Sequence, residues 1–566
     1  MTIDTYLDAW KLTEHPFRGE EARQDALMLR MVDAAARAAV ENPLRPSRLP
    51  RHPDYDKIAG EFARPSTAIV FGEKGSGKTA IRMQLVTSAA AYNAVNPTKR
   101  VLLVVHDDLS GPLARLHDRV RTVKRGKESP PLDSLRKMRL VDHVDALLAQ
   151  AVPGLIDSAL EHTTGASGAG PATSPDRIDL RVPPGLGEPG DGPRKVLKKL
   201  DRNLKRDLLL LQVPYDRADQ GSERTRELRK AMGIRTPLAT TIETVLAYGG
   251  WVLPTAVFLL LWKRGAGMQD AVAVTAFFAA MGLWLVALLK RAASERLGIV
   301  ARARRLHRQL RTSARTESSL ARSIRELPPG WRPSTLLPSN DSEEVRLGML
   351  SRFTRVVRAF GYESVVVIMD RLDEPPIIQG DPERMKAVVW PLLSNRFLQQ
   401  EGIAFKLLLP IDLRHQLMRE SSTFFQDARL DKQSMIDALA WTGVTLYDLA
   451  TQRLNACRPP EAGTISLGQL FAADVTREHL IDALEQMRQP RDAFKLLYQC
   501  IQDHCTQTHI GLAQIEAWRM TAGAAPVAAD ASPVPEAMRI SKATLDAARK
   551  AQIERIRQVA MGVRPG

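Results

Sequence analysis

Residues 67–79 read Thr-Ala-Ile-Val-Phe-Gly-Glu-Lys-Gly-Ser-Gly-Lys-Thr, and this stretch decides the fold. Its first five residues, Thr67–Phe71, predict a short buried strand, and a helix is expected from Thr79. Between them, Gly72-Glu73-Lys74-Gly75-Ser76-Gly77-Lys78-Thr79 has the spacing of a phosphate-binding loop. Its backbone N–H groups would cradle phosphate oxygens, Lys78 would bring a positive charge to the β and γ phosphates, and Thr79 would offer its hydroxyl to Mg²⁺. The stretch predicts a site for ATP and Mg²⁺.

A second apolar strand that ends in an acid lies far downstream, at Val365-Val366-Val367-Ile368-Met369-Asp370. An acid at the carboxyl end of a parallel strand is where Mg²⁺ would be held opposite Thr79, so Asp370 and Thr79 are the predicted metal ligands. A carboxylate a few residues further on would activate the attacking water. Glu374 is the first candidate for this catalytic role and Asp373 is a close competitor, although either could equally be a turn or helix-capping carboxylate.

Two apolar stretches, Thr244–Trp262 and Ala271–Leu289, lie between these two halves of the predicted site. Each has 19 residues and no Lys, Arg, Asp or Glu. As a helix, each would be about 29 Å long, which matches a hydrocarbon core of about 30 Å. They predict a membrane hairpin of two helices. The alternative is a buried helical hairpin in a large soluble core.

The positive charge of the chain supports the membrane interpretation. Of the net charge of +16, residues 190–235 contribute +6 and residues 290–325 contribute +9, so the surplus flanks the hairpin. By the positive-inside rule these flanks outweigh Lys263 and Arg264 in the turn. We therefore expect an inner (plasma) membrane protein with two spans, both termini in the cytoplasm, and anionic lipid headgroups as partners. Nucleic acid is an unlikely partner, since no basic patch interleaved with aromatic residues and no zinc-finger spacing occurs.

Cysteine usage and the N-terminus agree with a cytoplasmic enzyme. The N-terminus has no basic region followed by an apolar run, so no cleavable signal is expected. Three cysteines cannot form a disulfide framework. Cys500, His504, Cys505 and His509 have spacings that would suit zinc, but no second pair of ligands exists elsewhere, and cysteines packed or exposed on a lid helix are the favoured interpretation.

The pattern along the chain predicts an α/β fold with a parallel sheet that belongs to the P-loop NTPases, with an inserted membrane hairpin and a C-terminal helical lid. The predicted segments are a helical lead-in (1–64), the P-loop half of the ATPase core (65–110), an inserted helical region (111–235) with a linker at 163–193, the transmembrane hairpin (236–290), a basic juxtamembrane helix (291–340), the second half of the core (341–465), the helical lid (466–521), and a linker with a basic C-terminal helix (522–566).

At these residues the chain resembles the KAP and STAND groups of P-loop ATPases, and especially KAP proteins, in which a transmembrane hairpin interrupts the ATPase domain. The resemblance covers roughly residues 60–110 and 341–520. It rests on Gly72–Thr79, on Val365–Glu374, on the strand Phe405–Leu409 with the following Pro410-Ile411-Asp412-Leu413-Arg414, and on Gln489-Pro490-Arg491-Asp492.

The resemblance implies roles for several residues. Arg491 would sense the bound nucleotide from the start of the lid helix, and Asp412 or Arg414 would sense the γ-phosphate; a solvated arginine at Arg491 and a surface ion pair at the other two are the plainer alternatives. One departure matters. KAP proteins pair two acids directly after the strand, whereas here Arg371 follows Asp370, which leaves the identity of the water-activating residue open.

The resemblance also implies a function, namely a membrane-tethered ATP hydrolase that works as a nucleotide-controlled switch in bacterial signalling or anti-phage defence. A homo-oligomer and a protein partner of unknown identity would be consistent with this role. Two other functions remain open. One is a membrane scaffold that binds ATP with little turnover. The other is an ATPase serving export or envelope assembly, although two spans without intramembrane charge make no evident conduit.

Overall fold

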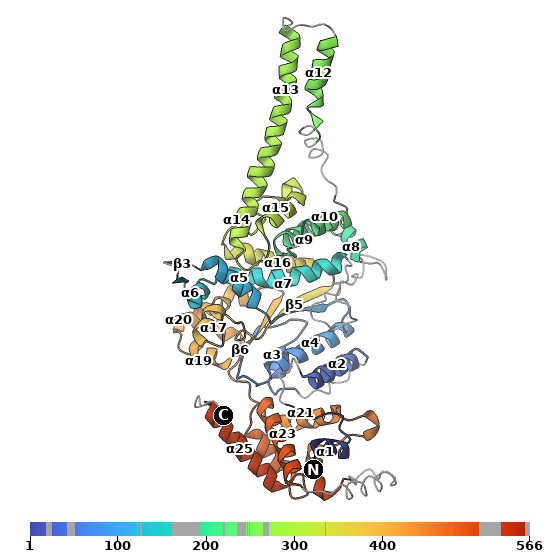
Figure 1. Cartoon of the computed structure of the whole chain (residues 1–566), viewed down its shortest axis with the longest axis vertical. Helices are drawn as coiled ribbons and strands as arrows, with labels where there is room; N and C mark the ends of the chain where they lie inside the picture. Colours follow the sequence, from blue (N-terminus) through green and yellow to red (C-terminus); the bar gives the residue numbers. More distant parts are fainter. Residues whose placement is uncertain are drawn as a thin grey trace. The chain divides into compact units, whose positions relative to one another are not determined.

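The computed structural model describes residues 1–18, 25–41, 51–121, 123–124, 127–128, 130–160, 193–218, 221–234, 245, 247, 249–263, 271–333, 335–508 and 534–560. The chain forms two compact units, and Figure 1 labels many of their helices and strands. The first unit consists of Met1–Asp107, Val366–Leu372 and Ala404–Gly566. The second consists of Asp108–Val365 and Asp373–Ile403.

A five-stranded parallel sheet with the order β2-β5-β6-β1-β7 organises the first unit, which confirms the predicted α/β class with a parallel sheet. Its strands are β1 (Ala68–Gly72), β2 (Arg100–His106), β5 (Tyr362–Met369), β6 (Ile403–Pro410) and β7 (Ser434–Ile436). The inner strands are nearly continuous apolar runs because parallel strands are covered on both faces. Along β1 and β6, Ala68 pairs with Lys406 and Gly72 with Pro410.

The helices of the first unit build two hydrophobic cores. They are α1 (Ile3–Ala9), α2 (Ala26–Glu41), α3 (Tyr55–Ala59), α4 (Lys78–Val95), α19 (Ile411–Leu417), α20 (Ser422–Ala428), α21 (Gly443–Ala456), α22 (Arg477–Glu485), α23 (Pro490–Gln507) and α25 (Lys542–Ala560). Side chains of α3 and α4 pack with the strands in one core. In the other, Tyr6, Trp10 and Phe17 join α21, α22, α23 and α25. This second core encloses the three cysteines, which are free and buried.

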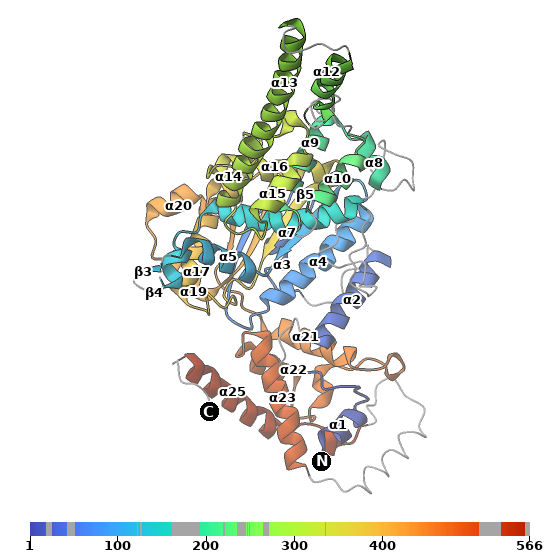
Figure 2. The same cartoon turned by 45° about the horizontal axis from the view of Figure 1, so that its top comes forward.

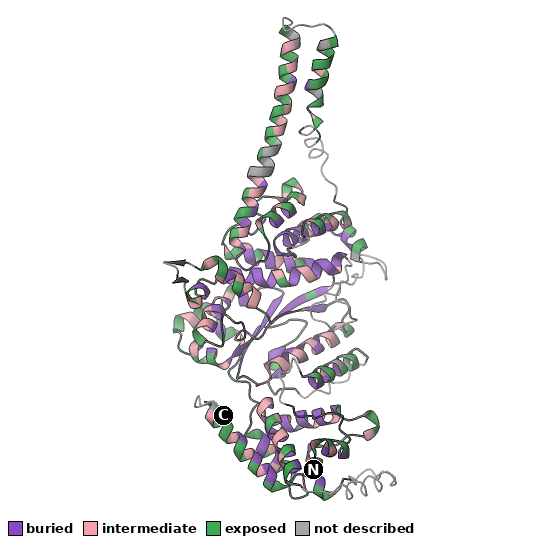
Figure 3. Cartoon of the chain, in the orientation of Figure 1, coloured by how far each residue is buried: buried purple, intermediate pink, exposed green. Residues whose placement is uncertain are grey.

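The second unit is mainly helical. Its elements are α5 (Ser110–Val120), a small hairpin of β3 (Val123–Lys124) and β4 (Lys127–Glu128), α6 (Pro131–Leu135), α7 (Leu140–Leu160), α8 (Pro193–Lys199), α9 (Arg202–Tyr215), α10 (Gly221–Ala231), α12 (Val252–Lys263), α13 (Ala271–Ala292), a π-helical segment (Ala293–Val300), α14 (Ala301–Gln309), α15 (Glu317–Glu326), α16 (Glu343–Arg358), α17 (Pro382–Val389) and α18 (Asn395–Leu398). Figure 3 shows that α7 is buried along most of its length.

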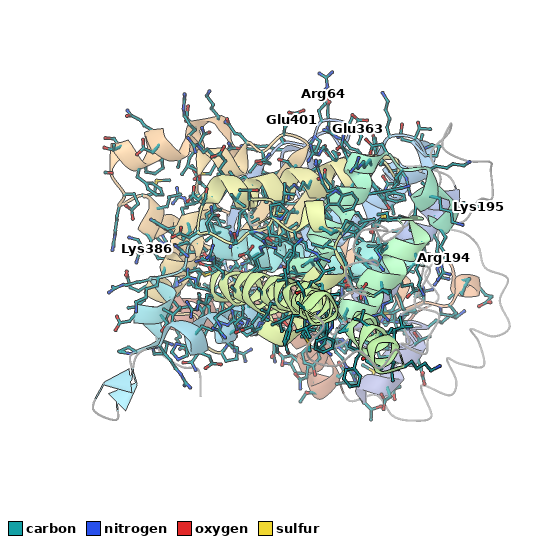
Figure 4. The ribbon with its side chains drawn as sticks, turned by 90° about the horizontal axis from the view of Figure 1, so that it is seen from above. Arg64, Arg194, Lys195, Glu363, Lys386 and Glu401 are labelled. Carbon is teal, nitrogen blue, oxygen red and sulfur yellow. The ribbon has the colours of Figure 1, made fainter. Side chains whose placement is uncertain are left out.

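Buried ion pairs join the helices of the second unit. Asp145 on α7 is fully buried between Arg346 of α16 and the hydroxyl of Tyr215 on α9, which donates to it at 2.7 Å. Burial raises the pKa of Asp145 to about 6, although Arg346 and the Tyr215 hydrogen bond act in the opposite direction. At the surface of this unit, Arg194 on α8, labelled in Figure 4, donates to the carbonyl oxygen of Leu160 at 2.9 Å and thereby ties α8 to the end of α7.

The predicted membrane hairpin is wrong. Helix α12 has 12 residues, because Gly250 and Trp251 form a turn before it, and at about 1.5 Å per residue it reaches only about 18 Å. It packs beside α13, as Figures 1 and 2 show. Within the part of the chain that the structure describes, no helix has both the length and the apolar character needed to cross a bilayer. An inner-membrane protein with two spans and two cytoplasmic termini is therefore not supported.

Two of the basic residues that suggested a membrane boundary, Arg224 and Arg315, are buried within the second unit instead. Arg224 is only 3% exposed and lies 2.6 Å from Asp157 and 2.9 Å from Asp216. Arg315 is 2% exposed and donates to backbone carbonyls and to the Ser323 hydroxyl. A charge count along the sequence treats all such residues as exposed. Because these two arginines are buried in the second unit, their charges are not available to lipid headgroups at a membrane surface.

Other predictions changed at helix breaks. Helix α17 ends at Val389, because Pro391 cannot donate a backbone hydrogen bond within a continuing helix. The basic helix expected over 291–340 is interrupted: the π-helical segment runs directly into α14, which ends at Gln309, and α15 is a separate helix that ends at Glu326. Residues 163–192 of the first predicted linker and 522–533 of the second lie outside the described residues, as does His509 of the considered zinc set.

Candidate functional site

The loop between β1 and α4 needs its glycines. Gly75 and Gly77 have φ values of +98° and +92°, in the left-handed region that residues with a side chain rarely adopt. A Cβ atom on Gly72 would collide with the Ser76 hydroxyl. A Cβ on Gly77 would lie 3.2 Å from Cζ2 of Trp441. The backbone therefore winds tightly through this loop and enters α4 directly at Lys78.

Lys78 folds back over the loop. Its Nζ atom donates to the carbonyl oxygen of Gly72 at 2.7 Å and to that of Glu73 at 3.0 Å. These contacts hold the ammonium above the loop, at the N-terminus of α4, where the helix dipole favours anions. Lys78 is half-buried, so a phosphate group could reach it from solvent by replacing a carbonyl partner.

Thr79 and Asp370 meet as the sequence predicts. The Thr79 hydroxyl donates to Oδ2 of Asp370 at 3.2 Å, although 291 positions separate the two residues. Burial raises the pKa of Asp370, while Arg82, Lys78 and the hydrogen bonds from Arg371 N–H and Thr79 oppose that shift. A hydroxyl and a carboxylate are hard oxygen donors that suit Mg²⁺, which usually takes one or two carboxylates and keeps water and phosphate as its other ligands.

The structure adds Arg82 and Asp107, which the sequence analysis did not identify. Arg82, on α4, is 7% exposed. Its Nη1 atom lies 2.6 Å from Oδ2 of Asp107 and 3.6 Å from Oδ2 of Asp370. Asp107 follows β2, and the backbone N–H of Asp370 donates to the carbonyl of His106 at 3.3 Å. Two carboxylates from neighbouring strand ends thus share one guanidinium group.

The start of α23 contacts the loop. The Gln489 amide donates to the Glu73 carboxylate. A Cβ atom on Gly75 would lie 2.9 Å from Cβ and 3.0 Å from Cδ of Arg491, so the Arg491 side chain lies directly against Gly75. Arg491 is half-buried, and its predicted role in sensing the nucleotide stays a prediction.

Trp441 fixes the loop from another side. Its Nε1–H donates to the Ser76 carbonyl at 2.7 Å, and its ring lies edge-on to His52 with centroids 5.1 Å apart. Burial lowers the pKa of His52, so this imidazole is neutral near pH 7. The Ser76 hydroxyl is 1% exposed and has no hydrogen-bond partner in the part of the chain described here.

Several predicted residues lie elsewhere or make other contacts. Asp373 and Glu374 belong to the second unit, so their catalytic role stays a prediction. Arg414 lies 3.3 Å from Asp437, in agreement with the plainer alternative of an ion pair, and Asp412 is exposed in the first turn of α19. Lys74 is exposed on the loop.

Comparison with protein-family models, with curated proteins and with solved structures finds no match to the chain.

Sequence signals for the added residues differ in strength. Arg82 lies three positions after Thr79, so both share one face of α4, and Asp107 closely follows the apolar run Val101–Val105. Both could have been found by asking which charges face the predicted strand ends. Trp441 follows β7, a strand of three residues that the sequence analysis did not predict, and it has no local signal.

Proposed function

We propose that the chain binds ATP with Mg²⁺ through Gly72–Thr79 and hydrolyses it as a nucleotide-controlled switch. The hydrogen bond between Thr79 and Asp370 supports this proposal most strongly. It joins the first turn of the helix after the glycine loop to the acid at the end of β5, a parallel strand that β6 separates from β1. This is the pairing that P-loop hydrolases use to hold Mg²⁺ beside the phosphates.

Binding would use groups that are already in position. Phosphate oxygens would accept hydrogen bonds from loop N–H groups at the N-terminus of α4, and Lys78 would exchange its contacts with Gly72 and Glu73 for the β and γ phosphates. Thr79 and Asp370 would hold Mg²⁺, which neutralises charge that develops on the phosphates during transfer. Arg491 would be the residue through which α23 responds to the nucleotide.

The switch would operate through α23. Gln489 contacts Glu73 and Arg491 contacts Gly75, so the start of this helix rests on the loop. The phosphates of a bound ATP would attract the Arg491 guanidinium and compete with its contact with Gly75. Hydrolysis would then change the position of α23 relative to the loop.

An ATP-binding scaffold with little turnover is the second candidate function. It is favoured by Arg371, which directly follows Asp370 in place of a second acid. Arg371 also has a left-handed backbone, with φ of +60°, and its N–H donates to Oδ1 of Asp370 at 2.9 Å. Turnover distinguishes the two functions.

Steady-state hydrolysis with and without Mg²⁺ tests the proposal. We expect phosphate release by the wild type that requires Mg²⁺ and falls about 100-fold or more in Asp370→Asn, because the amide removes the charge that holds the metal. Asp431→Asn is the matched control, since Asp431 is an exposed acid of the same unit. Tight ATP binding without phosphate release would favour the scaffold, and absence of both would contradict the proposal.

A further inference from the structure

Asp107 lies where a second carboxylate could serve the proposed site. It follows β2, beside β5, in the sheet order. Its Oδ2 atom and that of Asp370 are both within 3.6 Å of Nη1 of Arg82, and the same Asp370 oxygen accepts the Thr79 hydrogen bond. The two acids therefore share one edge of the sheet with the start of α4.

The two carboxylates differ in access to water. The side chain of Asp370 is 2% exposed, whereas that of Asp107 is 21% exposed. A metal-side ligand can be enclosed, but a group that activates an attacking water must reach a molecule that enters from solvent. The exposed fractions therefore suit different roles. The buried Asp370 suits the metal ligand, and the partly exposed Asp107 suits the group that activates water.

The segment after β5 does not supply this group directly. Arg371 occupies the next position, and its backbone N–H is used by Asp370. The end of the neighbouring strand β2 provides the Asp107 carboxylate instead, and the buried Arg82 holds this carboxylate in one orientation. An Arg–carboxylate pair at 2.6 Å is a short, charge-assisted contact, so the Asp107 side chain has little freedom to rotate.

We propose that Asp107 orients the attacking water and accepts its proton, and that Arg82 is the positioning residue that holds Asp107. This inference rests on the proposed ATP hydrolysis. In the step, the water oxygen forms a bond to the γ-phosphorus as a water proton passes to the Asp107 carboxylate. The bond between the γ-phosphorus and the β,γ-bridging oxygen breaks, and its electron pair stays with ADP. The proton on Asp107 then leaves to solvent.

Asp107→Asn in the full chain tests this assignment. We expect an ATP dissociation constant within about threefold of the wild type, because the phosphate contacts are untouched, and a kcat lower by about 100-fold or more. Asp107→Glu should restore part of the rate. Asp431→Asn serves as the control for loss of a carboxylate in the first unit.

Three outcomes decide whether Asp107 activates the attacking water. Wild-type turnover together with an equally active Asp107→Asn overturns the inference alone, and a slow Glu374→Gln or Asp373→Asn in that experiment would assign the step to the second unit. A wild type that binds ATP without hydrolysing it overturns both the inference and the proposed hydrolysis. If Asp107→Asn fails to fold, Asp107→Glu keeps the charge on Arg82 and carries the test: its kcat should lie well below that of the wild type at an unchanged ATP dissociation constant, and a wild-type kcat overturns the inference.

Discussion

Lys406 offers a test of the sheet that positions the site. It lies in β6 beside β1, is 0% exposed, and its Nζ atom donates to the carbonyl oxygens of Ala59 at 3.0 Å and Ser66 at 2.6 Å. No carboxylate pairs with it among the contacts of the described residues. Burial lowers the pKa of Lys406 from 10.5 to about 8. The folded protein thus holds this charge at a cost of about 3 kcal/mol.

The sign of the effect follows from proton binding. Between about pH 8 and pH 10.5 the unfolded chain still carries the Lys406 proton that the folded chain has lost, so the free energy of unfolding rises with pH in this window. The contribution of Lys406 to the free energy of unfolding is fully present above 10.5, the pKa of this lysine in the unfolded chain. It is lost as the pH falls through about 8, the pKa in the folded chain. For a folded pKa of about 8, the gain from about pH 7 to pH 9.5 is about 2 kcal/mol.

Urea unfolding of the wild type and Lys406→Met at both pH values measures this gain. The wild type should gain about 2 kcal/mol more than the variant over this range, because other titrating groups cancel in the comparison. Lys57→Met is the matched control, since Lys57 is exposed on α3 and its ammonium stays in water in both states. Parallel pH dependence in the wild type and Lys406→Met would refute the reasoning.

Two further predictions concern the packing around the loop and the lid. Arg453→Met should lower the free energy of unfolding, measured in urea, by about 3–5 kcal/mol. Arg453 is 3% exposed and lies 2.5 Å from Asp25, so its loss leaves the Asp25 carboxylate buried without its partner. The double variant Arg453→Met with Asp25→Asn should recover part of this loss. Gly77→Ala should weaken ATP binding by about tenfold or more, since a Cβ at φ of +92° costs about 1–2 kcal/mol and meets the Trp441 ring. In isothermal titration, Gly348→Ala, where a Cβ meets nothing within 4 Å, should bind as the wild type does.

The local half of the site could be predicted from the sequence. A short apolar strand, a glycine loop and a helix follow one another along the chain, so β1 and α4 were found within a residue or so. The meeting of Thr79 and Asp370 was also predictable, because the carboxyl ends of parallel strands share one edge of a sheet.

Contacts that depend on tertiary packing were less accessible. A single arginine such as Arg82 is as often solvated as paired, and only the fold shows that it lies between two acids. The membrane prediction failed for a similar reason. Hydropathy counted the apolar residues from Thr244 onward, whereas α12 begins at Val252, and the charge count could not reveal that Arg224 and Arg315 are buried.

Equilibrium binding of ATP to the wild type and Lys78→Ala tests the central claim most directly. By isothermal titration in the presence of Mg²⁺, the wild type should bind one ATP per chain, and Lys78→Ala should bind about 100-fold more weakly, because the loop loses the ammonium that Gly72 and Glu73 now hold in place. Lys99→Ala, which removes an exposed lysine of the same unit, should bind as the wild type does. Equal affinity in the wild type and Lys78→Ala would contradict the claim that Gly72–Thr79 is the nucleotide site.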